Sequence, residues 1–161
     1  MVEMKVSGIV LDPQSRSPIV VLRDGDERRA LLIWIGAPEA NAIMLALESI
    51  RLTRPTTHDL MANLIKQIKA TLISVVITDM QENTFYAQLN LKLGERDLVV
   101  DCRPSDAIAL ALRTNSPILV SEQVMLSSSI PVDQGKEEED SENFRKFIEN
   151  LKPSDFEQGR S

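Results

Sequence analysis

A charged turn at residues 101–106 carries the side chains best suited to chemistry in this chain. Asp101 closes an apolar stretch, Arg103 follows, and Pro104 and Asp106 open a predicted helix. Proline suits the first helical position, and an acidic side chain in the first turn is stabilised by the positive end of the helix dipole. Arg103 has two open roles: it pairs with Asp101 or Asp106 as a structural clamp, or it contacts a phosphate group.

His58 is the only histidine of the chain, which makes it the one candidate for general acid or base catalysis of the usual kind near neutral pH. Thr56 and Asp59 form a predicted capping box, which places His58 in the first turn of a helix. There it either transfers a proton or hydrogen-bonds across the fold and fastens it. Asp59 and Asp106 favour helix starts whatever the function of the protein, so the geometry must decide.

A repeated phrase indicates how these residues are positioned. Residues 42–47 match residues 107–112 at five of six positions, at an offset of 65 residues. An apolar stretch precedes each copy, at 31–35 and 98–100, and a proline stands just ahead of each predicted helix, at Pro38 and Pro104. We therefore expect an internal duplication of a β-β-β-α unit, with copies at about 1–52 and 70–115.

Hydrophobic periodicity predicts the remaining elements. Residues 2–11, 19–22, 30–35, 72–78, 85–93 and 98–100 are predicted strands, and residues 38–52, 57–69 and 104–115 are predicted helices. Residues 118–120 are expected to form a short edge strand, with Ser121 capping a short helix after it. Trp34 is expected in the core, and Tyr86, on the polar face of its strand, is the better candidate for stacking on a base. The predicted fold class is α+β, with a mixed or antiparallel sheet packed with helices and a C-terminal helical tail.

The composition, 43% apolar and 26% charged over 161 residues, is typical of one globular domain with a tail. We expect a domain at 1–132, an acidic linker at 133–141 and a short C-terminal helix and tail at 142–161. Phe144, Phe147, Ile148 and Leu151 would form one face of that helix. Such a short helix must bury this face on the domain or on a partner, because isolated short helices are marginal in water.

The charge and the termini limit the class of protein. The formal net charge is −6, which argues mildly against tight non-specific binding to nucleic acid but leaves room for a local basic patch. A single cysteine, Cys102, excludes an intrachain disulfide and suits a reducing compartment. No stretch approaches the ~20 apolar residues needed to span a bilayer, and no leader pattern opens the chain, so no membrane association and a cytoplasmic location are expected.

Several unusual strings together resemble the bifunctional nuclease domain family. They are IWIG at 33–36, EA at 39–40, RPTTHDL at 54–60 and TFYA at 84–87, with the opening stretch. The resemblance covers roughly residues 1–130 and keeps the order of the family's motifs. It implies an α+β fold with a duplicated strand-and-helix unit, and a nuclease that cleaves phosphodiester bonds of DNA, RNA or both.

Phosphodiester hydrolysis needs an activated water and charge neutralisation on the phosphate, and often a divalent metal held by carboxylates. We therefore expect Mg²⁺ or Mn²⁺ and no organic cofactor, with DNA or RNA as substrate. The expected roles are catalysis by His58, Asp101 and Asp106, phosphate binding by Arg54 and Arg103, and metal binding by Glu39, Asp101 and Asp106.

The rival hypothesis is a non-enzymatic interaction or regulatory module, whose motif residues hold repeats or subunits together. A homodimer or higher homo-oligomer is expected under either hypothesis, because an open sheet leaves unpaired edge strands.

Overall fold

The computed structural model describes residues 1–132 and residue 146. The predicted acidic linker at 133–141 lies outside the described residues, and of the predicted C-terminal helix and tail at 142–161 only residue 146 is described. The described part has the predicted α+β architecture. Within it, no helix is both long and apolar enough to cross a bilayer.

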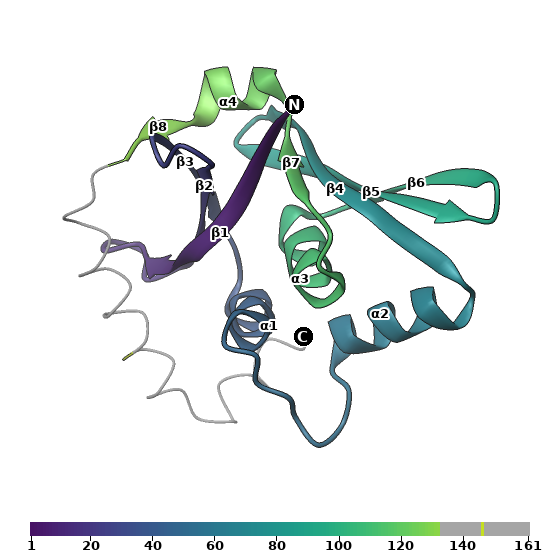
Figure 1. Cartoon of the computed structure of the whole chain (residues 1–161). Coiled ribbons are helices and arrows are strands. Elements are labelled where there is room, and N and C mark those ends of the chain that lie inside the picture. The colour runs from purple at the N-terminus through teal and green to yellow at the C-terminus, as the bar shows by residue number, and fades with distance from the viewer. Residues whose placement is uncertain (133–145, 147–161) are drawn as a thin grey trace.

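The described residues form eight strands and four helices (Figure 1). The strands are β1 (Val2–Leu11), β2 (Pro18–Asp24), β3 (Arg29–Trp34), β4 (Ala70–Gln81), β5 (Thr84–Leu93), β6 (Arg96–Cys102), β7 (Ile118–Val120) and β8 (Ile130–Pro131). The helices are α1 (Ala37–Leu47), α2 (Thr57–Gln67), α3 (Pro104–Thr114) and α4 (Glu122–Ser128). The order of three strands followed by one helix thus occurs twice, as β1-β2-β3-α1 and β4-β5-β6-α3. The duplication itself stays a prediction, which superposition of the two units would test.

All eight strands belong to one mixed sheet in the order β6-β5-β4-β7-β1-β2-β3-β8. The predicted edge position of residues 118–120 is wrong, because β7 lies in the middle of the sheet. It pairs antiparallel with β1, Val2 opposite Val120, and parallel with β4, Val75 opposite Ile118. Hydrogen bonding on both sides, and burial of Ile118 and Val120, compensate for its length of three residues.

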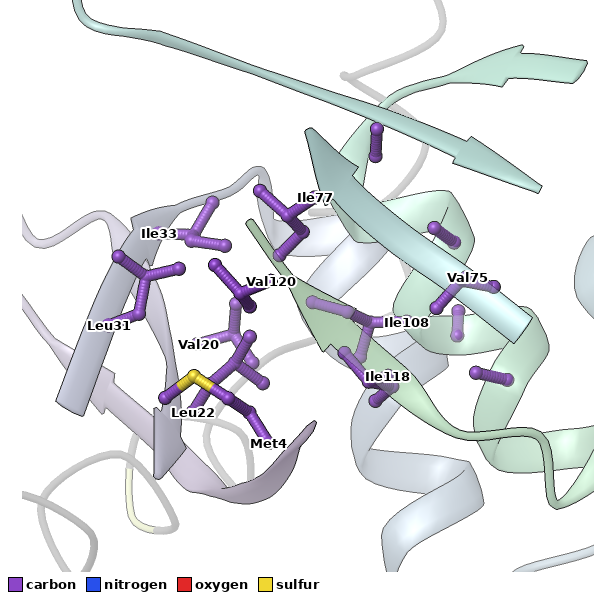
Figure 2. Packing of buried hydrophobic residues seen from close by; sticks show 14 of the residues in the cluster. Met4, Val20, Leu22, Leu31, Ile33, Val75, Ile77, Ile108, Ile118 and Val120 are labelled. Atoms are coloured by element: carbon purple, nitrogen blue, oxygen red, sulfur yellow. The ribbon is translucent and has the colours of Figure 1, made fainter. Parts of the chain in front are cut away.

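The sheet curves around α1 and α3, which lie inside its concave face (Figure 1). Side chains from both halves meet there in one apolar cluster, for example Leu22 and Ile33 from the first half and Val75 and Ile77 from the second (Figure 2). The central part of α3, residues 107–111, is completely buried in this cluster. The two charged ends of α3 are therefore held in fixed positions by a buried helix.

Two helix ends show where local signals were sufficient and where they were not. Helix α3 ends as predicted, because Asn115 adopts the left-handed conformation (φ 53°) that terminates helices. Helix α1 ends at Leu47 and not near residue 52, because Ser49 is left-handed (φ 54°). The carbonyl of Leu45 then accepts the N–H of Ile50. Residues 48–55 consequently form an exposed loop between α1 and α2.

The prediction that Trp34 belongs to the core is wrong, since this residue is 54% exposed. It lies at the end of β3, where its side chain turns outward and its Nε1–H donates to Asp12 Oδ2 at 3.0 Å. The polar indole N–H thus finds a partner at the surface, as tryptophan usually requires. Tyr86 is exposed on β5, as its position on the polar face predicted.

Candidate functional site

Each of the first three helices carries an acidic residue at its third position. These residues are Glu39 in α1, Asp59 in α2 and Asp106 in α3. A negative charge in the first turn is favourable because the free N–H groups there are partly positive. The three helix starts are thus locally encoded, and two arginines of the α3 region bind all three carboxylates.

Arg103 precedes α3 and joins the starts of α1 and α3. Its Nε donates to Asp106 Oδ2 at 2.9 Å and its Nη2 to Asp106 Oδ1 at 3.2 Å, which forms a bidentate pair. Its Nη1 donates to Glu39 Oε1 at 3.2 Å. Carboxylates from the two units, Glu39 and Asp106, thus lie on the same guanidinium. The Arg103 side chain nevertheless remains 63% exposed, so solvent and ligands can reach the guanidinium.

His58 completes this group from the side of α2. Its Nε2 lies 2.9 Å from Asp106 Oδ1, while its side chain is only 8% exposed. The predicted alternative that His58 bonds across the fold is confirmed by this contact. Burial alone would raise the pKa of Asp106, but hydrogen bonds from Arg103 and His58 outweigh it and lower this pKa. We call Glu39, His58, Arg103 and Asp106 the Arg103 cluster.

A second group lies at the other end of α3, and the sequence analysis missed it. Arg113 Nε donates to Asp59 Oδ1 at 2.7 Å, Nη1 to the carbonyl of Ala109 at 2.9 Å and Nη2 to the carbonyl of Ala42 at 3.0 Å. Its side chain is 10% exposed. We call Arg113 and these three partners the Arg113 cluster. The only signal in the sequence was a basic residue in the last turn of a predicted helix.

Asp59 itself is strongly stabilised as a carboxylate. It accepts the backbone N–H and the hydroxyl of Thr56, each at 2.9 Å, which confirms the predicted capping box. The hydrogen bond from the Thr56 backbone is the largest cause of a low pKa. Burial opposes it and Arg113 adds to it, so that the pKa of Asp59 falls to about 2. The group is therefore ionised at any physiological pH.

Two predicted site residues do not join the Arg103 cluster. Asp101 is exposed on β6, where Cys102 packs toward the core, so alternation along the strand turns Asp101 to the other face. Arg54 is exposed in the loop between α1 and α2. Within residues 1–132, no hydrogen bond connects either side chain to the cluster.

The predicted metal ligands are likewise not assembled in this structure. Glu39 and Asp106 both face the Arg103 guanidinium, and Asp101 lies elsewhere. Among the residues described, no three histidine, cysteine or acidic side chains are arranged to hold a metal ion. Cys102 offers no substitute nucleophile, because burial and the nearby charges of Asp106 and Asp101 raise its pKa to about 11.

Comparison with known proteins places the chain among related sequences. The model of the bifunctional nuclease domain matches residues 20–133. A protein of Mycobacterium tuberculosis strain H37Rv, itself described as uncharacterized, is 37% identical over 164 residues, which cover 97% of this chain and 98% of the relative.

Plant proteins named bifunctional nuclease 1 are also similar. The one from Oryza sativa subsp. japonica is 32% identical over 121 residues, which are 72% of this chain and 36% of the plant protein. The one from Arabidopsis thaliana is 30% identical over 120 residues, which are 71% of this chain and 37% of the plant protein. The match thus covers little more than a third of each plant protein. Because the family model matches most of this chain, residues 20–133, the chain belongs to the bifunctional nuclease domain family.

Proposed function

We propose that this protein is a nuclease that hydrolyses phosphodiester bonds of DNA or RNA, with the Arg103 cluster as its reactive site. Membership in the bifunctional nuclease domain family and the names of the plant relatives support this proposal. The observation that carries it is the exposed guanidinium of Arg103, held by two carboxylates beside the only histidine of the chain.

Arg103 is suited to bind the scissile phosphate. A guanidinium has five N–H donors, of which the contacts to Asp106 and Glu39 use three, so two remain for phosphate oxygens. The two carboxylates fix the orientation of the guanidinium before substrate binds. A preoriented positive charge stabilises the negative charge that develops on the phosphate oxygens in the transition state.

Glu39 is the better carboxylate to activate water. Asp106 uses both of its oxygens, Oδ1 for His58 and Arg103 and Oδ2 for Arg103. Glu39 uses only Oε1 in hydrogen bonds among the described residues, so Oε2, which lies beside Gly36, is left to accept a proton. In this step the water oxygen bonds to phosphorus and its proton moves to Glu39. The bond from phosphorus to the leaving oxygen breaks, and this oxygen takes a proton from solvent water to leave as an alcohol.

In this proposal His58 is a positioning residue, because its Nε2 is bound to Asp106 and holds this carboxylate in place. Proton transfer by His58, a catalytic role of Asp101, phosphate binding by Arg54 and a requirement for Mg²⁺ or Mn²⁺ all stay predictions. The Asp101→Asn variant tests the catalytic role of Asp101, because it removes the negative charge and keeps the shape of the side chain. If Asp101 takes part in catalysis, the rate falls at least about tenfold.

The deciding experiment is a cleavage assay on labelled single-stranded DNA and RNA, with Mg²⁺ or Mn²⁺ and, in parallel, with chelator. The wild type is expected to cut and Arg103→Ala to lose most of the rate. Arg96→Ala, at an exposed arginine in β6, is the matched control and should cut normally. If folded Arg103→Ala protein cuts at the wild-type rate, the activity comes from a contaminant or from another site.

The rival proposal of a non-enzymatic interaction module is favoured by the edges of the sheet. Strand β6 is an edge strand, and Val99 and Val100 are exposed on it. Unpaired edge strands invite pairing with another chain, so a homodimer or higher oligomer is expected. Sedimentation that shows only an 18.0 kDa monomer at micromolar concentration would contradict this expectation.

A further inference from the structure

A groove of about 1100 Å³ opens beside the Arg113 cluster. It is lined by the loop after α1, by α2, by the start of β4 and by the end of α3. These elements meet in the lower part of the view in Figure 1. The volume exceeds that of most small-molecule pockets, roughly 300–1,000 Å³. Its size therefore suits an extended ligand.

The charge of the groove differs from that of the whole chain. Its charged lining consists of Arg51, Lys66, Lys69, Arg113 and Asp59. Arg113 and Asp59 neutralise each other through their short ion pair. Arg51, Lys66 and Lys69 are exposed, and no ion pair connects them to other described residues. A chain with a formal net charge of −6 thus gathers a basic surface here.

The walls of the groove also carry exposed apolar side chains. Ile50 and Leu52 line it, and both are about half exposed in the loop after α1. Pro55 adds a third apolar group on the same loop. Surfaces that bind single-stranded nucleic acid combine positive charge for the phosphates with side chains, usually aromatic, against which the base faces lie. Within residues 1–132, the lining of this groove contains no aromatic residue, so its contacts to base faces would come from aliphatic side chains.

The groove adjoins the Arg103 cluster through the first turn of α2. His58 is bonded to Asp106 in the cluster, and the next residue, Asp59, lines the groove. Neighbouring residues of α2 therefore connect the groove, at the C-terminal end of α3, with the residues proposed to cut the polynucleotide, at its N-terminal end.

We infer that the groove binds the single-stranded polynucleotide on which the Arg103 cluster acts. Its phosphates contact Arg51, Lys66 and Lys69, and its bases lie against Ile50 and Leu52. This inference rests on the proposed nuclease function and adds the path of the substrate to it. The phosphate backbone is shared by DNA and RNA, so the experiment includes both.

A purely structural reason for the two lysines also exists and must be separated from binding. Lys66 lies in the last turn of α2, and Lys69 follows its end with a left-handed backbone (φ 60°). Basic residues at such positions stabilise the negative end of a helix. A structural role predicts lower thermal stability on substitution and unchanged binding, whereas a binding role predicts the reverse.

The test is the double variant Lys66→Gln/Lys69→Asn in the full chain. Asparagine is chosen at residue 69 because it tolerates the left-handed conformation. The matched control, Lys5→Gln/Lys92→Gln, removes the same two charges from exposed positions on β1 and β5. Binding of fluorescent oligo-dT and oligo-U is followed by anisotropy over a range of salt concentrations, and a gel confirms that the strands stay intact.

The groove variant is expected to bind at least about tenfold more weakly than the control. Its plot of log affinity against log salt should be shallower by about 1.4, since each lost phosphate contact removes ~0.7 on a single strand. If the groove variant binds only oligo-dT more weakly, the substrate is DNA. If it binds only oligo-U more weakly, the substrate is RNA. Equal affinity and equal salt dependence of the groove and control variants would overturn the inference.

The same measurements separate this inference from the proposed function. Arg103→Ala should lose cleavage and, because Arg103 contacts only the scissile phosphate, make the salt dependence of binding shallower by no more than about 0.7, half the change expected for the groove variant. Binding through the groove without any cleavage by wild-type protein would refute the nuclease and leave the groove standing. Cleavage that the groove variant carries out at the wild-type rate and affinity would refute the groove and leave the nuclease standing.

Discussion

Arg103 and Arg113 lie at the two ends of the same buried helix, α3. Both bind the same kind of partner, an acidic residue in the first turn of a helix. Their surroundings differ. Arg103 is 63% exposed and binds only carboxylates, whereas Arg113 is 10% exposed and also donates to two backbone carbonyls. The Arg113 cluster thus connects α1, α2 and α3 in the interior, and the Arg103 cluster faces the solvent.

The comparison shows that the two arginines differ in their access to solvent and not in their type of partner. Exposed ion pairs contribute about 0–1 kcal/mol to stability, because water competes for both partners. Breaking a buried pair costs about 3–5 kcal/mol, because it leaves a charge without a partner. The fold consequently depends on Arg113, while Arg103 is free to exchange contacts with a phosphate.

The largest expected effect is the loss of stability on removing the buried arginine, Arg113. Arg113→Ala is expected to lower the free energy of unfolding by about 2 kcal/mol, because two backbone carbonyls lose their donor, while solvent reduces the loss at Asp59, whose side chain is 39% exposed. Arg103→Ala should lower it by less than ~1 kcal/mol. Urea denaturation of both variants measures the difference. Equal losses of stability would show that the two clusters are equivalent and that the comparison fails.

The next effect concerns catalysis. Arg103→Ala is expected to reduce kcat/KM for oligonucleotide cleavage at least about tenfold, or ~1.4 kcal/mol of transition-state stabilisation. Arg103→Lys should recover little, because an ammonium cannot span Asp106 and Glu39 as the planar guanidinium does. Full recovery with lysine would mean that only the charge matters.

A smaller effect should follow from displacing Glu39 without altering it. A methyl group at Gly36 would overlap Glu39 Oε2, and the backbone of Gly36 (φ −80°) accepts alanine without strain. Gly36→Ala should therefore push the carboxylate away from Arg103 and reduce the cleavage rate about threefold, ~0.65 kcal/mol. Gly25→Ala is the control, because nothing lies within 4 Å of its added methyl group. Equal rates for both variants would remove Glu39 from the mechanism.

A further effect concerns the dependence of stability on pH. The pKa of Asp59 falls from 3.8 to about 2 on folding. Its stabilising contribution is therefore complete above pH 3.8 and is lost as the pH falls toward about 2. Asp59→Asn should flatten the acid limb of the curve of unfolding free energy against pH. An unchanged acid limb would indicate that Asp59 is not the carboxylate that titrates there.

Much of the fold follows from local signals in the sequence. Thr56 with Asp59 and Pro104 with Asp106 mark helix starts that the structure confirms, because capping and dipole effects act within one turn. The position of β7 could not be predicted in this way. Its three residues pair with strands distant in sequence, and such pairing depends on the whole sheet.

The same distinction applies to the site. Four residues of the Arg103 cluster were named from the sequence, because their helix starts were recognisable: Glu39, His58, Arg103 and Asp106. Asp101 does not join the Arg103 cluster, because alternation along β6 turns its side chain to the face opposite Cys102. That alternation was present in the sequence. The pairing of Arg113 with Asp59 links two helices across the interior, and no local signal specifies it.

The central place of β7 also has a consequence for biosynthesis. Val2 at the start of the chain pairs with Val120, so the sheet cannot close until nearly the whole domain has left the ribosome. Until then β1 and β4 each present an unpaired edge to other nascent chains, at the stage when aggregation competes with folding. Such long-range pairing slows folding, and chains truncated before residue 118 should require chaperones to stay soluble.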